Sequence, residues 1–145
     1  FFLDYKELDL RSGELVEWVR FRTPVSDVLF NFEKVSKRTH LDIASVNTAI
    51  AVEMRDGRIL NARMSAGGVA PIPMLLRRTA EYLGGRVPDA ETAFEAAEMA
   101  RSEVSPISDV RGSADYKRLL LGQLVFAHFN ALFGIGEELL QEASP

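Results

Sequence analysis

Cysteine is absent from the 145-residue sequence. This absence excludes disulfides, a thiolate nucleophile, iron–sulfur ligation and a zinc–thiolate site within these residues. It is compatible with a reducing compartment, and we expect a cytoplasmic protein. Histidine is also scarce: His40 and His128 lie far apart and show no metal-binding spacing such as HExxH. We therefore expect a solvent-facing His40 in a polar loop and a half-buried His128 on a helix.

An excess of positive charge and long apolar runs are also missing. The 17 Lys and Arg residues are outnumbered by 21 Asp and Glu residues, which gives a net charge of −4 and argues against a nucleic-acid surface. No uninterrupted apolar run approaches the roughly 18 residues of a membrane span. The sequence therefore predicts neither nucleic acid nor membrane as a partner. Because it opens on Phe1-Phe2 and shows no signal peptide, we expect a segment of a longer polypeptide.

The first half of the chain has the alternation of β-strands. Apolar and polar residues alternate in 14–22 and again in 28–37, which predicts a strand in each range. The runs 44–54 and 58–66 are rich in apolar residues and flank a short connection that contains Asp56-Gly57. Asp-Gly between two such runs predicts a tight hairpin turn, because glycine adopts the positive φ that the turn requires.

The second half has helical spacing. It predicts helices over 74–83, over 89–104 with Asp89 as N-cap, and over 113–132 with Ser113 as N-cap. The residues of the last helix expected to face inward are Tyr116, Leu119, Leu120, Leu124, Ala127 and Ala131. Strands followed by helices predict an α+β fold, with an antiparallel sheet of three to four strands and three helices packed on one face. We expect this domain to span 1–136, with 137–145 as an acidic C-terminal tail.

General chemical motifs are absent from the sequence. There is no P-loop, no GxGxxG and no GxSxG, and no serine has an evident histidine partner. The unusual stretch is 34–45, KVSKRTHLDIAS, which is dense in charge yet joins two apolar strands. Loops on a rigid sheet commonly carry ligand contacts. Judged from the residues alone, a solvated strand connection is the alternative and stays open.

Several segments together resemble a known protein family. They are FFLDYKELDLRSGELVEWVRF at 1–21, FEKVSKRTHLDIASV at 32–46, ARMSAGGVAPIP at 62–73 and PISDVRGSADYKRLL at 106–120. Their order and spacing resemble the C-terminal domain of the FAD-binding flavoprotein of molybdenum hydroxylases. This family includes xanthine dehydrogenase, carbon monoxide dehydrogenase and aldehyde oxidases. The SDVRGSADYKR segment resembles the small, FAD-binding subunit of bacterial xanthine dehydrogenases.

The resemblance implies a role in electron transfer. In this family a molybdopterin centre oxidises the substrate and [2Fe–2S] clusters relay the electrons to FAD, which in the dehydrogenases passes a hydride to NAD+. An N-terminal domain outside these residues binds most of the FAD, and the C-terminal domain closes over the isoalloxazine ring. The molybdopterin and the clusters belong to partner domains or subunits, and the chain by itself is not expected to be active. The alternative is a free-standing α+β interaction or assembly module without flavin.

The resemblance also implies which residues approach the flavin. Lys34 matches a basic residue that could stabilise negative charge on the reduced flavin, and Asp42 and Ile43 match a pair near the ring. Val16 matches an apolar position whose backbone approaches the flavin, and Lys6 stands where relatives often have Arg. Two other charged residues, Asp109 and Arg111, are expected to be structural and to hold the segment before Ser113. The aromatic residues Phe126, Phe129 and Phe133 are expected to pack against other helices or another subunit.

Overall fold

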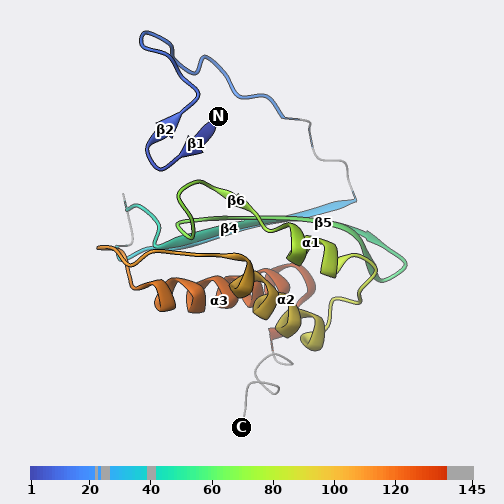
Figure 1. The fold of residues 1–145 in the computed structure, drawn as a ribbon. Coiled ribbons are helices and arrows are strands. Elements are labelled where there is room, and N and C mark those ends of the chain that lie inside the picture. Colours follow the sequence, from blue (N-terminus) through green and yellow to red (C-terminus); the bar gives the residue numbers. More distant parts are fainter. Residues whose placement is uncertain (22, 24–26, 39–41, 137–145) are drawn as a thin grey trace.

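The computed structural model describes residues 1–21, 23, 27–38 and 42–136, and it has an α+β fold (Figure 1). Its elements are β1 (Phe2–Asp4), β2 (Glu7–Leu8), β3 (Val28–Val35), β4 (Val46–Arg55), β5 (Arg58–Gly67), β6 (Met74–Leu75), α1 (Arg77–Leu83), α2 (Ala90–Glu103) and α3 (Ala114–Phe133). An antiparallel sheet has the order β3-β4-β5-β6, and β1 pairs only with β2. The three helices lie on one side of the four-stranded sheet in Figure 1, which confirms the predicted fold class.

The hairpin between β4 and β5 forms where it was predicted. Arg55 pairs with Arg58, which leaves Asp56 and Gly57 as a two-residue turn with φ of 49° and 73°. Positive φ at both positions is typical of a type I′ turn, whose twist matches that of the paired strands. The local sequence is therefore enough to specify this turn.

One face of the sheet forms the hydrophobic core. The inward-facing residues of β4 and β5 are Val46, Thr48, Ile50, Val52, Ile59, Ala62, Met64 and Ala66, all buried. Ile59 is out of phase with Ala62, Met64 and Ala66 along β5. It still lies on this face, because the pairing of the two strands shifts in register between Glu53 and Met54 of β4. On the outer face Phe30, Phe32 and Leu75 are more than half exposed. The helices thus cover one face of the sheet and leave the other face open.

The predicted helix caps are confirmed. The Asp89 side chain accepts a hydrogen bond from the Thr92 amide at the start of α2, and the Ser113 hydroxyl accepts one from the Tyr116 amide at the start of α3. The first helix is shorter than the predicted 74–83. It begins at Arg77, because Met74 and Leu75 pair with β5 as the short strand β6.

The predicted inward face of α3 is only partly right. Leu124 is buried, Leu120 packs against the core and Ala127 is half-buried, but Tyr116, Leu119 and Ala131 are exposed. The residues buried in their place include two polar ones, Lys117 and His128, with Leu121, Gly122, Val125 and Phe129. Apolar residues occur all around α3, so their spacing did not select one side. The face was decided by hydrogen-bonding partners that Lys117 and His128 find elsewhere in the fold. The expected packing of Phe126 is confirmed, since its ring lies 4.9 Å from that of Phe94 on α2.

The strand predicted at 14–22 is wrong over the residues that the structure describes. Residues 14–21 form no strand, and Leu15, Val19 and Phe21 are all more than 75 % exposed. A strand needs a neighbour that accepts its backbone hydrogen bonds and a layer that covers its apolar side chains. No described strand pairs with this segment, so its alternation produces no regular structure here. We call residues 1–21 the N-terminal arm. The predicted tail at 137–145 lies outside the described residues.

Candidate functional site

Three connecting segments meet at one end of the sheet (Figure 1). They are the described residues of the 34–45 loop, which begins in the last two residues of β3, the 67–73 loop, which begins in the last residue of β5 and leads to β6, and the 105–112 segment between α2 and α3. Lys37 Nζ donates to the Val110 carbonyl at 2.6 Å, and the Ser45 hydroxyl donates to the Arg111 carbonyl at 3.0 Å. Gly68, at φ 83°, passes so close to Ser45 that a Cβ there would lie 2.4 Å from the Ser45 carbonyl oxygen. Glycine is therefore required where these segments touch.

Asp42 organises the 34–45 loop. One carboxylate oxygen accepts the Arg38 amide at 2.8 Å, and the other lies 3.3 Å from the Arg38 guanidinium. The hydrogen bond from the Arg38 amide holds the pKa of Asp42 below its ordinary value. Lys34 Nζ donates to the Asp42 carbonyl at 2.7 Å, so both predicted site residues belong to one hydrogen-bonded unit. Residues 39–41, including His40, lie outside the described residues.

Asp109 organises the 105–112 segment. Its carboxylate forms a 2.9 Å ion pair with Lys117 and accepts the Arg111 amide at 2.8 Å. Lys117 also donates to the Ile107 carbonyl at 2.8 Å, and its side chain is only 3 % exposed. Lys117 is the main cause of a lowered pKa at Asp109. The structure confirms the expected structural role of Asp109 and of the Arg111 backbone.

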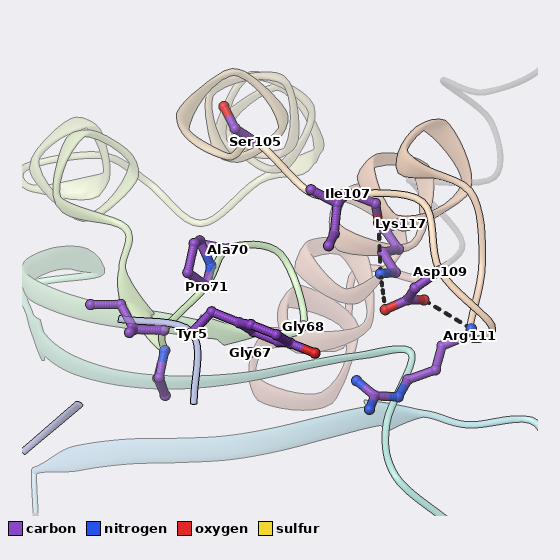
Figure 2. A pocket seen from close by; sticks show the side chains of 12 residues that line it. Tyr5, Gly67, Gly68, Ala70, Pro71, Ser105, Ile107, Asp109, Arg111 and Lys117 are labelled. Atoms are coloured by element: carbon purple, nitrogen blue, oxygen red, sulfur yellow. Dashed lines mark hydrogen bonds and ion pairs between the residues drawn. The ribbon is translucent and has the colours of Figure 1, made fainter. Parts of the chain in front are cut away.

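A cavity of about 440 Å³ lies between the 67–73 loop and the 105–112 segment (Figure 2). Its walls are mostly apolar, and charged side chains come only from Asp109, Arg111 and Lys117. Tyr5, in the turn between β1 and β2, contributes its ring from the N-terminal arm. The other lining residues are Gly67, Gly68, Ala70, Pro71, Ile72, Pro73, Ser105 and Ile107.

The structure groups three of the five predicted site residues. Lys34 and Asp42 are hydrogen-bonded, and Ile43 follows them with 68 % of its surface exposed. Val16 and Lys6 lie instead on the N-terminal arm. Val16 is half exposed in a segment without regular structure, and Lys6 Nζ lies 5.3 Å from the centre of the Tyr5 ring.

His128 is a core residue, as expected, but it is fully rather than half buried. Its Nδ1 lies 2.9 Å from Asn31 Nδ2, and its Nε2 lies 2.7 Å from Thr48 Oγ1. Burial lowers its pKa to about 4. Within the described part of the chain, no cluster of His, Cys, Asp and Glu could hold a metal ion, and no helix is long and apolar enough to cross a membrane.

Sequence reasoning did not single out Tyr5, Lys37 or Ser45, although Lys37 and Ser45 belong to the 34–45 stretch that it named. Each of them lies inside a segment that carries the family resemblance, so that resemblance was the available signal. What it lacked was the contacts between segments, such as those that join residues 37 and 45 to the 110–111 turn. The contacts also bring more basic than acidic side chains to one end of an acidic protein: Lys34, Lys37, Arg38, Arg111 and Lys117, with Asp42 and Asp109.

Comparisons with known proteins identify a family. The family described as "CO dehydrogenase flavoprotein C-terminal domain" matches residues 32–132. The carbon monoxide dehydrogenase medium chain of Afipia carboxidovorans is 27% identical over 116 residues, which are 80% of this chain and 40% of that one. The xanthine dehydrogenase of Blastobotrys adeninivorans is 29% identical over 140 residues, which are 91% of this chain and 10% of that one.

Solved structures show the same fold. Carbon monoxide dehydrogenase from Hydrogenophaga pseudoflava has a TM-score of 0.71 and 27% identity, covering 76% of this chain and 38% of that one. Quinoline 2-oxidoreductase from Pseudomonas putida 86 has a TM-score of 0.66 and 28% identity, covering 80% and 39%. The chain spans less than half the length of the curated relatives named above. On the match over residues 32–132, the chain belongs to the CO dehydrogenase flavoprotein C-terminal domain family.

Proposed function

We propose that this chain completes the flavin site of a molybdenum hydroxylase, with the 34–45 loop beside the isoalloxazine ring of FAD. The observation that carries the proposal is the meeting of three segments, each of which bears the family's sequence pattern, at one basic end of the fold. Three of the five residues that the resemblance selects, Lys34, Asp42 and Ile43, lie at this end, whereas Val16 and Lys6 lie on the N-terminal arm. FAD bound there would supply electron transfer between the enzyme's other redox centres and an external acceptor.

The residues at this end fit a flavin. Ile43 presents an exposed apolar side chain next to the basic Lys34, which suits a planar ring with polar edges. Lys34 places an ammonium where the ring gains negative charge on reduction, and fixed positive charge stabilises that state. Asp42 positions both groups, because its backbone carbonyl accepts from Lys34 and its carboxylate closes the loop through Arg38.

Molybdopterin and [2Fe–2S] clusters would lie in partner domains or subunits, and most of the FAD contacts in an N-terminal domain. Relatives with such long additional regions support this division, since this chain covers 40% of one medium chain and 10% of one xanthine dehydrogenase. The proposal takes NAD+ as the electron acceptor, as the sequence resemblance implies, and an assay of NADH formation tests that part separately.

The test uses Lys34→Ala in the complete enzyme with its FAD. Loss of one such electrostatic contact in a dry site is worth about 3 kcal/mol, so the flavin potential should fall by up to about 60 mV for a two-electron couple. Substrate oxidation measured with a dye that takes electrons before the flavin should not change, while acceptor turnover at the flavin should. Asp42→Ala should weaken FAD retention, because the loop loses the acceptor of the Arg38 amide.

Arg58→Ala is the matched control. Arg58 is also an exposed cation on the same sheet, but it lies at the β4–β5 turn, at the opposite end from Lys34. The flavin potential should be the same in Arg58→Ala and in the unmodified enzyme. If Lys34→Ala also leaves the potential unchanged, the 34–45 loop is only a solvated strand connection. If the complete protein lacks FAD altogether, the free-standing interaction module is the better description.

A further inference from the structure

The cavity beside the 105–112 segment has an unsatisfied cation at its rim. The Arg111 backbone is fully used, since its amide donates to Asp109 and its carbonyl accepts from Ser45. Its guanidinium, by contrast, forms no hydrogen bond or salt bridge with any of the described residues. Figure 2 shows the Arg111 side chain extending from the turn toward the side of the cavity where Gly67 and Gly68 lie. A guanidinium carries five N–H donors, so these are available to a ligand.

The other charges in the cavity are already neutralised. Lys117 and Asp109 form a 2.9 Å ion pair, and the remaining hydrogen bonds of both go to the 105–112 segment itself. Arg111 also attracts Asp109 electrostatically, and the three side chains together carry one net positive charge. One guanidinium fork matches one carboxylate in a bidentate pair. A dianionic phosphate would bring a second negative charge toward Asp109, which disfavours it.

The cavity walls are mostly apolar, and two of them are held in place, while the third is the ring of Tyr5, which is 65 % exposed on the N-terminal arm. Tyr5 and Ile107 lie on opposite sides of the cavity in Figure 2, and Pro71 contributes a further apolar surface. The 67–73 loop is fixed by the close contact between Gly68 and Ser45, and the opposite wall is fixed by the Asp109–Lys117 ion pair. A preformed cavity of a few hundred Å³ with apolar walls and few polar groups is typical of small-molecule sites. A tyrosine ring in the wall favours a planar aromatic ligand.

We propose that this cavity binds a planar aromatic monocarboxylate, with the carboxylate on Arg111 and the ring between Tyr5 and Ile107. The site differs from the one proposed for the flavin, because Lys34, Asp42 and Ile43 do not line it. The two sites are neighbours through the hydrogen bond from Ser45 to the Arg111 carbonyl.

Benzoate is the probe, and its binding to the complete protein is measured by titration calorimetry. Benzoate should bind, and its neutral analogue benzamide should bind at least tenfold more weakly, because a charge-assisted hydrogen bond is replaced by a neutral one. Phenyl phosphate should bind more weakly than benzoate because of Asp109. Cyclohexanecarboxylate should also bind more weakly, since it lacks the flat ring that the Tyr5 side chain favours.

Variants test the two contacts. Arg111→Ala should weaken benzoate binding at least tenfold. The affinity of Arg111→Lys for benzoate should lie between those of Arg111→Ala and the unmodified protein, because lysine keeps the charge but cannot form a bidentate pair with the carboxylate. Tyr5→Leu should also weaken binding. Arg118→Ala is the matched control, since Arg118 is a cation on α3 that pairs with Asp115 and does not line the cavity. The backbone bonds of Arg111 remain in its variants, so their thermal unfolding should match that of the control.

Failure of benzoate to bind would overturn the proposal, as would equal dissociation constants for Arg111→Ala and Arg118→Ala. Equal binding of benzamide and benzoate would show that Arg111 does not recognise the anion, which also overturns it without relying on any variant. Tighter binding of phenyl phosphate would contradict the argument from Asp109. Flavin content is not part of the measurement, so each of these results leaves the proposed function untouched.

Discussion

Lowering the pH toward 4 should destabilise the fold through His128. This side chain is fully buried in α3, between Asn31 of β3 and Thr48 of β4. Asn31 Nδ2 also donates to Glu33, so it is the amide nitrogen, a donor, that faces His128 Nδ1. His128 Nδ1 therefore accepts, and its Nε2 carries the proton and faces Thr48. Protonation at Nδ1 would place two donors against each other in a fully buried site.

The direction and the size of the change in folding stability follow from the shift in the pKa of His128. Burial lowers the pKa of His128 from 6.5 to about 4 in the folded state, so between these values the unfolded chain binds more protons than the folded one. The free energy of unfolding therefore has its full His128 contribution above pH 6.5. This contribution declines as the pH falls toward 4, by about 3 kcal/mol in total. The carboxylates with lowered pKa, Asp42, Asp89 and Asp109, begin to lose their stabilising contribution below about pH 5, where the unfolded chain starts to protonate its Asp side chains, so they overlap only the lower end of this window.

Urea unfolding at a series of pH values between 7 and 4 measures this effect. His128→Gln keeps a donor and an acceptor for Thr48 and Asn31 but cannot titrate. The variant should be less stable at pH 7, and its unfolding free energy should lose most of the dependence on pH in this window. His40→Gln is the control and should retain that dependence. The reasoning is refuted if the unmodified chain is equally stable at pH 6.5 and pH 4.5, or if His128→Gln keeps the full slope.

Two further predictions concern packing. Leu121→Ala should lower the free energy of urea unfolding by about 2–5 kcal/mol, because Leu121 is fully buried. Leu119→Ala should lower it by well under half as much, because Leu119 is 52 % exposed. Equal losses would show that the inward face of α3 is wrongly placed. Gly57→Ala should cost about 1–2 kcal/mol for its positive φ alone, since nothing lies near its added methyl group. Gly68→Ala should cost clearly more in the same assay, because its methyl group meets the Ser45 carbonyl, and a loss no greater than that of Gly57→Ala would contradict the close approach.

Local signals in the sequence predicted most of the regular structure. The β4–β5 turn depends on the backbone freedom of Asp56 and Gly57, and the starts of α2 and α3 depend on side chains that bond to amides three residues away. These interactions span only a few residues, so a short stretch of sequence contains both partners. The resemblance to the flavoprotein family likewise came from short segments, and it identified the family that the comparisons show.

Errors arose where a residue's partner is distant in the sequence, or where no described strand lies beside the segment. The alternation in 14–21 is real, but a strand forms only beside another strand, and none pairs with it here. On α3, Lys117 is buried because Asp109 and the Ile107 carbonyl satisfy it, and His128 because Asn31 and Thr48 do. A search for apolar residues at helical spacing excludes both of these polar residues, although the fold buries them.

The sequence by itself determined the α+β class, the hairpin, the helix caps and the family, because each depends on short-range backbone preferences or on residues adjacent in the chain. Only the tertiary structure decided that the 34–45, 67–73 and 105–112 segments share one end of the molecule. That arrangement rests on long-range contacts, from Lys37 to Val110, from Ser45 to Arg111 and from Gly68 to Ser45. The same contacts hold the Arg111 backbone, while its guanidinium forms no hydrogen bond with the part of the chain that the structure describes. No pattern of neighbouring residues encodes this arrangement.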